Sequence, residues 1–109
     1  MRAALLALLV ALPGVGKAAA LETAYLSLLA ADYLQTRWIA DNSYELNPIL
    51  GRHPSQAKVR NYFLGVAAGS LAVLEVLPSD KRRVALICMV GLEGATVARN
   101  LRIGVRFKF

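Results

Sequence analysis

Apolar residues fill three long stretches of this chain, and short polar segments separate them. Residues 21–40 are mostly apolar and are good helix formers without Gly or Pro. Residues 61–77 and about 84–103 are the other two apolar stretches. A helix that crosses a membrane needs roughly 20 such residues. The pattern therefore predicts an all-α fold, a small helical membrane bundle with three antiparallel transmembrane helices and short loops.

The N-terminal stretch is shorter than these three and ends in small residues. Arg2 precedes an unbroken run of Ala, Leu and Val over residues 3–12, and a Pro-Gly pair ends the run. Three alanines follow further on, the last of them Ala20. This order is typical of a secretory signal peptide, and the run is too short to span a bilayer. We expect residues 1–20 to be a signal peptide cleaved after Ala20, or else a short uncleaved anchor. Residues 21–109 would form a single helical membrane domain.

Turn-forming residues mark the segments between the helices. Residues 44–60 contain two Xaa-Pro pairs and a glycine, which predicts a loop. Ser55 is a predicted N-cap for a short helical turn that runs toward Tyr62. Residues 81–83 predict a short basic turn before the third apolar stretch. Residues 103–109 alternate between apolar and polar or small positions, which predicts a short strand or an extended tail.

Composition and charge support placement in a membrane. The apolar fraction is 57%, against about 45–50% in soluble domains, and charged residues make up only 18%. The net charge is +6, but the basic residues lie at the ends of the apolar stretches. Such flanking charges fit contact with lipid headgroups and argue against a nucleic-acid partner. We expect the bacterial inner membrane by the secretory pathway, with a periplasmic helical bundle as the alternative.

The distribution of positive charge also predicts an orientation. The 44–60 loop and the C-terminal tail together carry seven basic residues, counted from Arg99 for the tail, against three in the 81–83 turn. Positive charges favour the cytoplasmic side of a membrane. The loop and the tail are therefore expected inside the cell, and the turn outside.

Polar side chains interrupt the first and third apolar stretches at helical spacing. Asp32, Gln35 and Thr36 share one helix face, and so do Glu93 and Asn100, with Thr96 beside them. An unpaired polar group in an apolar interior costs several kcal/mol, so we expect the two stripes to face each other. Arg37 and Arg99 are the expected counter-charges.

The polar stripes have two interpretations. They form either an interhelical hydrogen-bond lock or a pocket that binds a headgroup, a cation or a partner segment. The residues of this polar cluster are Asp32, Gln35, Thr36, Glu45, Asn47, Glu93 and Asn100. We expect a small integral membrane accessory or interaction protein that uses the cluster for recognition or locking. The alternatives are a small membrane enzyme, an ion- or headgroup-binding protein that uses the carboxylates, and a phage-type lysis factor.

Established catalytic and cofactor motifs are missing from the sequence. It contains no Gly-rich phosphate loop, no Gly-x-Ser-x-Gly elbow and no His-Glu-x-x-His. His53 is the only histidine, so a His-rich metal site is excluded, although carboxylates could hold a hard cation. We expect no cofactor and no catalytic residue.

Small residues recur on the second and third predicted helices. Gly65 and Gly69 lie four residues apart, and Gly91 and Ala95 repeat that spacing. Such spacing allows a second helix to approach closely in a membrane. We expect a homo-oligomer or a larger membrane partner to contact these positions, besides the membrane lipids.

One segment resembles a known group of proteins. The order Asp32-x-x-Gln35-Thr36, then Glu45-x-Asn47-Pro48-x-x-Gly51, resembles a family of small uncharacterised membrane proteins of bacteria and phages. The resemblance covers about residues 28–62. It implies a small helical membrane protein and marks Asp32, Thr36, Glu45, Asn47 and Pro48 as positions to test, but it implies no substrate.

Overall fold

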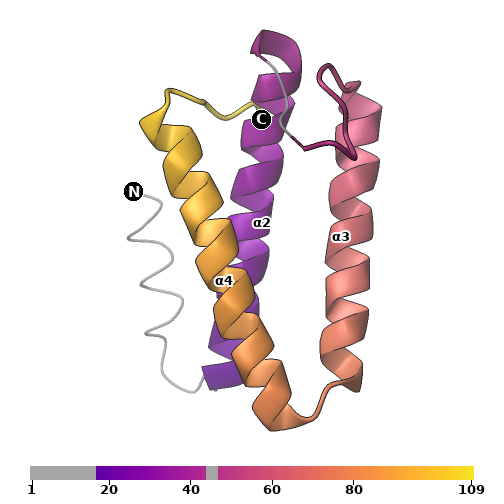
Figure 1. The fold of residues 1–109 in the computed structure, drawn as a ribbon, viewed down its shortest axis with the longest axis vertical. Helices are drawn as coiled ribbons and strands as arrows, with labels where there is room; N and C mark the ends of the chain where they lie inside the picture. Colours follow the sequence, from indigo (N-terminus) through magenta and orange to yellow (C-terminus); the bar gives the residue numbers. More distant parts are fainter. Residues whose placement is uncertain (1–16, 44–46) are drawn as a thin grey trace.

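Three helices in up-down-up order make up the fold (Figure 1). The computed structural model describes residues 17–43 and 47–109, and these contain α2 (Lys17–Asn42), α3 (Gln56–Val76) and α4 (Ser79–Arg102). Within these residues there is no β-strand. The prediction of an all-α bundle with antiparallel neighbours is thereby confirmed.

The first helix begins before the predicted boundary of the mature chain. α2 runs without a break from Lys17 through Ala20 to Asn42. Ala20 and Ala24 are both buried. Residues 1–16 of the predicted signal peptide lie outside the described residues, so its cleavage stays a prediction. Cleavage after Ala20 would remove the first turn of α2.

The second helix starts at its predicted cap but continues further than expected. The Ser55 hydroxyl accepts a hydrogen bond from the Lys58 backbone N–H at 3.1 Å, as an N-cap does. The predicted short turn and the predicted helix from residue 61 are one helix, because no breaker lies between them.

The predicted basic turn is wrong, because its residues belong to the first turns of α4. That helix begins at Ser79, directly after Pro78. From there the Arg82 guanidinium donates to the Leu74 carbonyl at 2.7 Å and to the Leu77 carbonyl at 3.1 Å. These carbonyls end α3 and have no partner within their own helix. Arg82 therefore ties the end of α3 to the start of α4.

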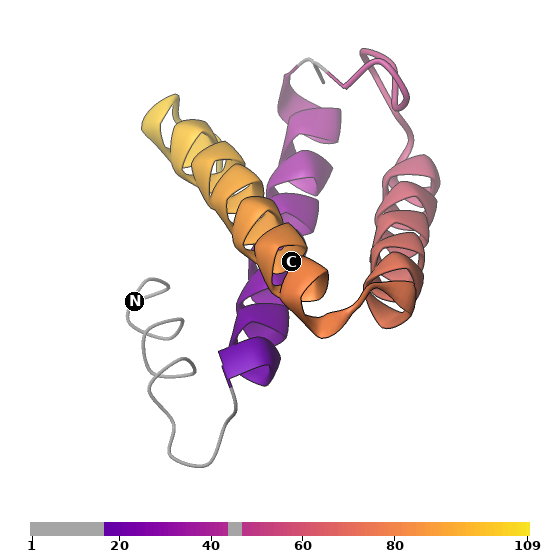
Figure 2. The ribbon, with the colours of Figure 1, turned by 60° about the horizontal axis from the view of Figure 1, so that its bottom comes forward.

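The central helix is α2, which packs against both of the others. Its contact with α4 is more extensive than its contact with α3, and α3 and α4 contact each other little. Figure 2 shows α3 and α4 separating from the turn that joins them. The bundle is consequently open at the end where the 47–55 loop and the C-terminal tail lie.

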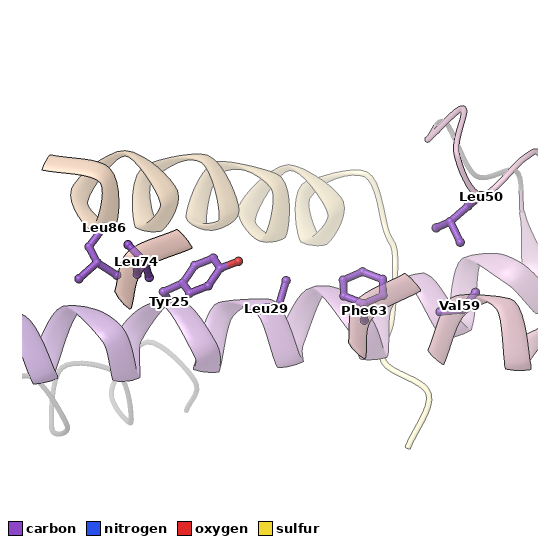
Figure 3. Close-up of a cluster of buried hydrophobic side chains, with 7 residues drawn as sticks. All are labelled: Tyr25, Leu29, Leu50, Val59, Phe63, Leu74 and Leu86. Atoms are coloured by element: carbon purple, nitrogen blue, oxygen red, sulfur yellow. The ribbon is translucent and has the colours of Figure 1, made fainter. Parts of the chain in front are cut away.

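The apolar core follows the length of α2 (Figure 3). Leu74 and Leu86 lie beside Tyr25 near the N-terminal end of α2. Phe63, Val59 and the loop residue Leu50 fill the other end. Since Leu50 is buried, the loop is held against the bundle by its own apolar side chain.

Much of the apolar surface of α3 and α4 faces outward. Both helices are long and apolar enough to cross a membrane, and only 17% of the residues in the most apolar part of each are buried. A core helix of a water-soluble protein would bury most of them. In α2 the charged residues Glu22, Asp32 and Arg37 interrupt the apolar run, and the prediction of a third span is not confirmed.

The predicted small-residue faces find little contact inside the described chain. A Cβ added at Gly65, Gly69 or Gly91 would meet no other atom within 4 Å. Only Gly94 comes near another helix, with Leu28 Cδ1 at 3.8 Å from the added Cβ. Association of these faces with a second chain stays a prediction.

The C-terminal tail turns back onto α2 at a glycine. Gly104 has φ +92° and donates to the Leu101 carbonyl, while Val105 donates to the Asn100 carbonyl. This pair of bonds is a Schellman motif, which requires a left-handed residue. Residues 105–109 form no strand, so the strand alternative is wrong. The tail is held by the Lys108 backbone N–H, which donates to the Leu34 carbonyl at 3.0 Å.

Acidification is expected to release this tail. The Lys108 ammonium group and the Gln56 amide donate hydrogen bonds to the Asp41 carboxylate, and they hold its pKa below the ordinary 3.8. A lowered folded-state pKa means that the stabilisation is fully present above about pH 4. It is lost as the pH falls through the lowered pKa.

The backbone amide NMR signal of Lys108 reports on this release. It should titrate with a midpoint below 3.8 in the wild type and lose that transition in Asp41→Asn. A midpoint at or above the ordinary value would show that Lys108 and Gln56 do not stabilise the carboxylate.

Candidate functional site

A pocket lies between the three helices at the open end of the bundle. Its volume is about 370 Å³, within the range of about 300–1,000 Å³ that is usual for small-molecule sites. All three helices, the loop and the tail contribute to its wall. The polar residues that line it are Asp32, Thr36, Ser43, Asn47, Tyr62, Glu93, Thr96, Arg99 and Asn100.

Gln35 and Asn100 form a buried connection between α2 and α4. The Asn100 amide donates to Gln35 Oε1 at 3.0 Å, and the Gln35 amide donates to the Val97 carbonyl at 3.1 Å. Gln35 is 0% exposed and Asn100 is 7% exposed. These two side chains are hydrogen-bonded to each other away from water, so this contact joins α4 to α2.

Asp32 and Glu93 meet inside the pocket, one helical turn away from Gln35. Both side chains line the pocket, and Thr36 Oγ1 donates to Asp32 Oδ1 at 3.2 Å. Carboxyl oxygens accept hydrogen bonds, so the two side chains present acceptor atoms to the pocket. The site is therefore an acceptor for hydrogen-bond donors.

One oxygen of this pair lacks a partner. Glu93 Oε2 is buried and makes no hydrogen bond to any of the described residues. Buried polar atoms are nearly always paired with protein, water or a ligand. Glu93 Oε2 is thus the atom of the pocket that is best suited to receive a donor from a bound molecule.

The loop contributes Asn47 to the pocket, and the Asn47 side chain also stabilises the loop by hydrogen bonds. Asn47 Oδ1 accepts from the Ile49 backbone N–H at 2.9 Å, which is an Asx turn. Its amide donates to the Tyr62 hydroxyl at 2.8 Å, so the loop is attached to α3. Gly51 closes the turn with φ +80°. Asn47 serves the loop as well as the pocket wall.

The predicted counter-charges are only partly at the site. Arg99 lines the pocket, as expected from its position on α4. Arg37 instead donates to Gln56 Oε1 at 3.2 Å, and its guanidinium lies 5.7 Å from the centre of the Tyr33 ring. Its role as partner of the carboxylates is therefore wrong, because its side chain points toward α3. Glu45 lies outside the described residues.

Two polar contacts escaped the sequence reasoning because their residues look like ordinary core or loop positions. The Tyr25 hydroxyl donates to Ser70 Oγ at 2.9 Å and connects α2 to α3. Tyr62 supplies the partner of Asn47. These contacts can be recognised only once the packing of the helices and the loop is known.

The residues of the pocket do not form a metal cage in the described part of the chain. Among residues 17–43 and 47–109 no three His, Cys, Asp or Glu side chains converge as metal ligands. The pocket instead offers two carboxyl groups, one open acceptor oxygen and several hydroxyl and amide groups, with the Arg99 guanidinium in the same wall.

Comparison with known proteins gives no relative. No protein-family model, no curated protein and no solved structure matches the chain. The pocket and the surface of the helices are therefore the features that bear on function.

Proposed function

We propose that this chain is a small integral membrane protein that binds a ligand with a protonated amine between its three helices. The observation that carries the proposal is the buried, unpartnered Glu93 Oε2 in a pocket of about 370 Å³. Asp32 and Glu93 are the acceptor groups. Gln35 and Asn100 are the lock that keeps α2 and α4 in place around them.

The outward-facing side chains support the membrane part of the proposal. Leu64, Val73 and Val76 are exposed on α3, and Val84, Ile87, Leu92 and Leu101 are exposed on α4. Water would solvate these faces poorly, whereas lipid tails would cover them. The charges agree, because the loop and the tail lie at the same end of the bundle (Figure 1), and both carry basic residues. That end is the proposed cytoplasmic side.

Fractionation tests membrane residence separately from ligand binding. The full chain should stay in the membrane pellet after alkaline carbonate and enter solution only with detergent. Intact-mass analysis of the same sample reports whether residues 1–20 are removed. Release by carbonate would overturn the membrane proposal and favour a periplasmic bundle.

A substitution at Glu93 tests the pocket. Glu93→Gln keeps the shape of the side chain but replaces its carboxyl group with an amide that cannot become a carboxylate, and hydrogen bonds to charged groups contribute about 1.5–3 kcal/mol. We expect its affinity for ethylammonium, measured by calorimetry on the detergent-solubilised protein, to fall about tenfold or more. Glu75→Gln, an exposed site on α3, is the matched control and should bind as the wild type does.

Tetramethylammonium separates hydrogen bonding from charge alone, because it is a cation without N–H donors. It should bind the wild type more weakly than ethylammonium does, and it should lose less affinity in Glu93→Gln. Equal binding of ethylammonium to both proteins would refute the assignment of Glu93.

Binding is proposed rather than catalysis, because the observation that carries the proposal is one open acceptor atom, Glu93 Oε2, which can hold a donor without reacting with it.

A further inference from the structure

A second cavity, on the outer side of the bundle, has a different character from the polar pocket. It has a volume of about 340 Å³ and lies between α2 and α3. Its walls are apolar side chains, with a single charged group, Arg60. We call it the α2–α3 groove. It is lined by Leu26, Ala30, Tyr33, Phe63, Leu64 and Ala67, besides Leu29 and Arg60.

The groove has a charged end and an apolar end. Arg60 lies in the first turns of α3, near the loop, and Ala67 lies two helical turns further along. At 1.5 Å per residue this separation is about 10 Å along the helix. On α2, Tyr33 lies toward the loop end and Leu26 lies away from it. The groove therefore runs along the helices, with its cation at the membrane-boundary end.

We infer that the α2–α3 groove holds one acyl chain of an anionic phospholipid, with the lipid phosphate against Arg60. The inference rests on the proposed membrane location. Charge complementarity selects the lipid class, because guanidinium groups bind phosphate and basic sites between membrane helices attract anionic headgroups. The Arg37 guanidinium lies 5.7 Å from the centre of the Tyr33 ring, and Tyr33 lines the groove.

The apolar walls of the groove fit this occupant. An acyl chain would lie along the apolar walls formed by Leu26, Leu64 and Ala67. Burying apolar surface against these walls is favourable, whereas water or an ion would find no polar partner there. The headgroup then reaches the level of the basic loop. A zwitterionic lipid would fill the same walls but would lack the net charge that Arg60 attracts.

Native mass spectrometry of the full chain in detergent tests the inference with an equimolar mixture of phosphatidylglycerol and phosphatidylcholine. The wild type should retain phosphatidylglycerol preferentially. Arg60→Gln should reduce that preference about fivefold, the effect of one basic residue at a membrane surface. The control Arg52→Gln removes an equal charge from an exposed loop position outside the groove and should preserve the preference.

A second variant fills the apolar walls without disturbing the core. Ala30 is exposed and lines the groove, so Ala30→Phe should reduce retention of both lipids. Ala68→Phe places the same side chain on an exposed position outside the groove and should not. Circular dichroism of each variant checks that helix content is unchanged.

The outcomes separate this inference from the proposed function. A protein that stays in carbonate-washed membranes but shows the same lipid preference in wild type and Arg60→Gln would overturn the groove and leave the membrane proposal standing. An equal loss in Arg52→Gln would assign the preference to overall surface charge and also overturn the groove. Release of the protein by carbonate would overturn both.

Discussion

Gln35→Ala is expected to lower the free energy of unfolding by about 1–3 kcal/mol, because it leaves the buried Asn100 amide without its acceptor. The void left by a side chain that is 0% exposed adds to this cost. Unfolding by SDS in mixed micelles, followed by circular dichroism, measures the change. Asn61→Ala removes an exposed amide from α3 and should change the stability little.

A double-mutant cycle isolates the contact itself. Gln35→Ala and Asn100→Ala together should destabilise the protein by less than the sum of the two single changes. In membrane proteins such couplings average about 0.6 kcal/mol and reach about 1.7 kcal/mol. Strict additivity would show that the bond between these two side chains does not hold α4 against α2. The shape of the pocket around Glu93 would then need a different explanation.

Leu86→Ala is expected to destabilise the bundle by about 1–3 kcal/mol. In water-soluble proteins a buried Leu→Ala change costs about 2–5 kcal/mol, part of which is transfer of the side chain out of water. If the unfolded helices stay in lipid, the transfer contribution is largely absent, and only the loss of packing contributes to the destabilisation. Leu86 is 0% exposed and packs with Leu74 and Tyr25 at the closed end of the bundle (Figure 3).

The same substitution on the opposite side of α4 provides the control. Leu92 is 71% exposed, so Leu92→Ala should leave SDS unfolding nearly unchanged. Equal destabilisation by the two changes would mean that Leu92 is also packed, against a second chain. That result would support the predicted association through the Gly91 face and would contradict a monomeric bundle.

Local pattern was sufficient for much of the fold. Apolar runs of near-spanning length predicted three antiparallel helices, and Ser55 was recognised as an N-cap because capping depends on one side chain and its own neighbours. Errors occurred where a boundary depends on neighbouring elements. The basic residues after Pro78 resemble a turn in sequence, but Arg82 is helical because it can donate to the end of α3.

The candidate site shows the same division between local and tertiary information. Helical spacing alone placed Asp32, Gln35 and Thr36 on one face, and Glu93 and Asn100 on another, since 3.6 residues per turn fixes such faces. The sequence could not assign different roles within each face. That depends on the register and divergence of the helices, which bury Gln35 beside Asn100 but leave Asp32 and Glu93 in a pocket.

The sequence by itself therefore determined the helices, the polar faces and the clustering of basic residues, because each follows from local spacing and composition. Only the tertiary structure decided the lock, the pocket and the α2–α3 groove. These require side chains far apart in the chain to meet, and their meeting depends on how α3 and α4 pack on α2 and separate toward the loop.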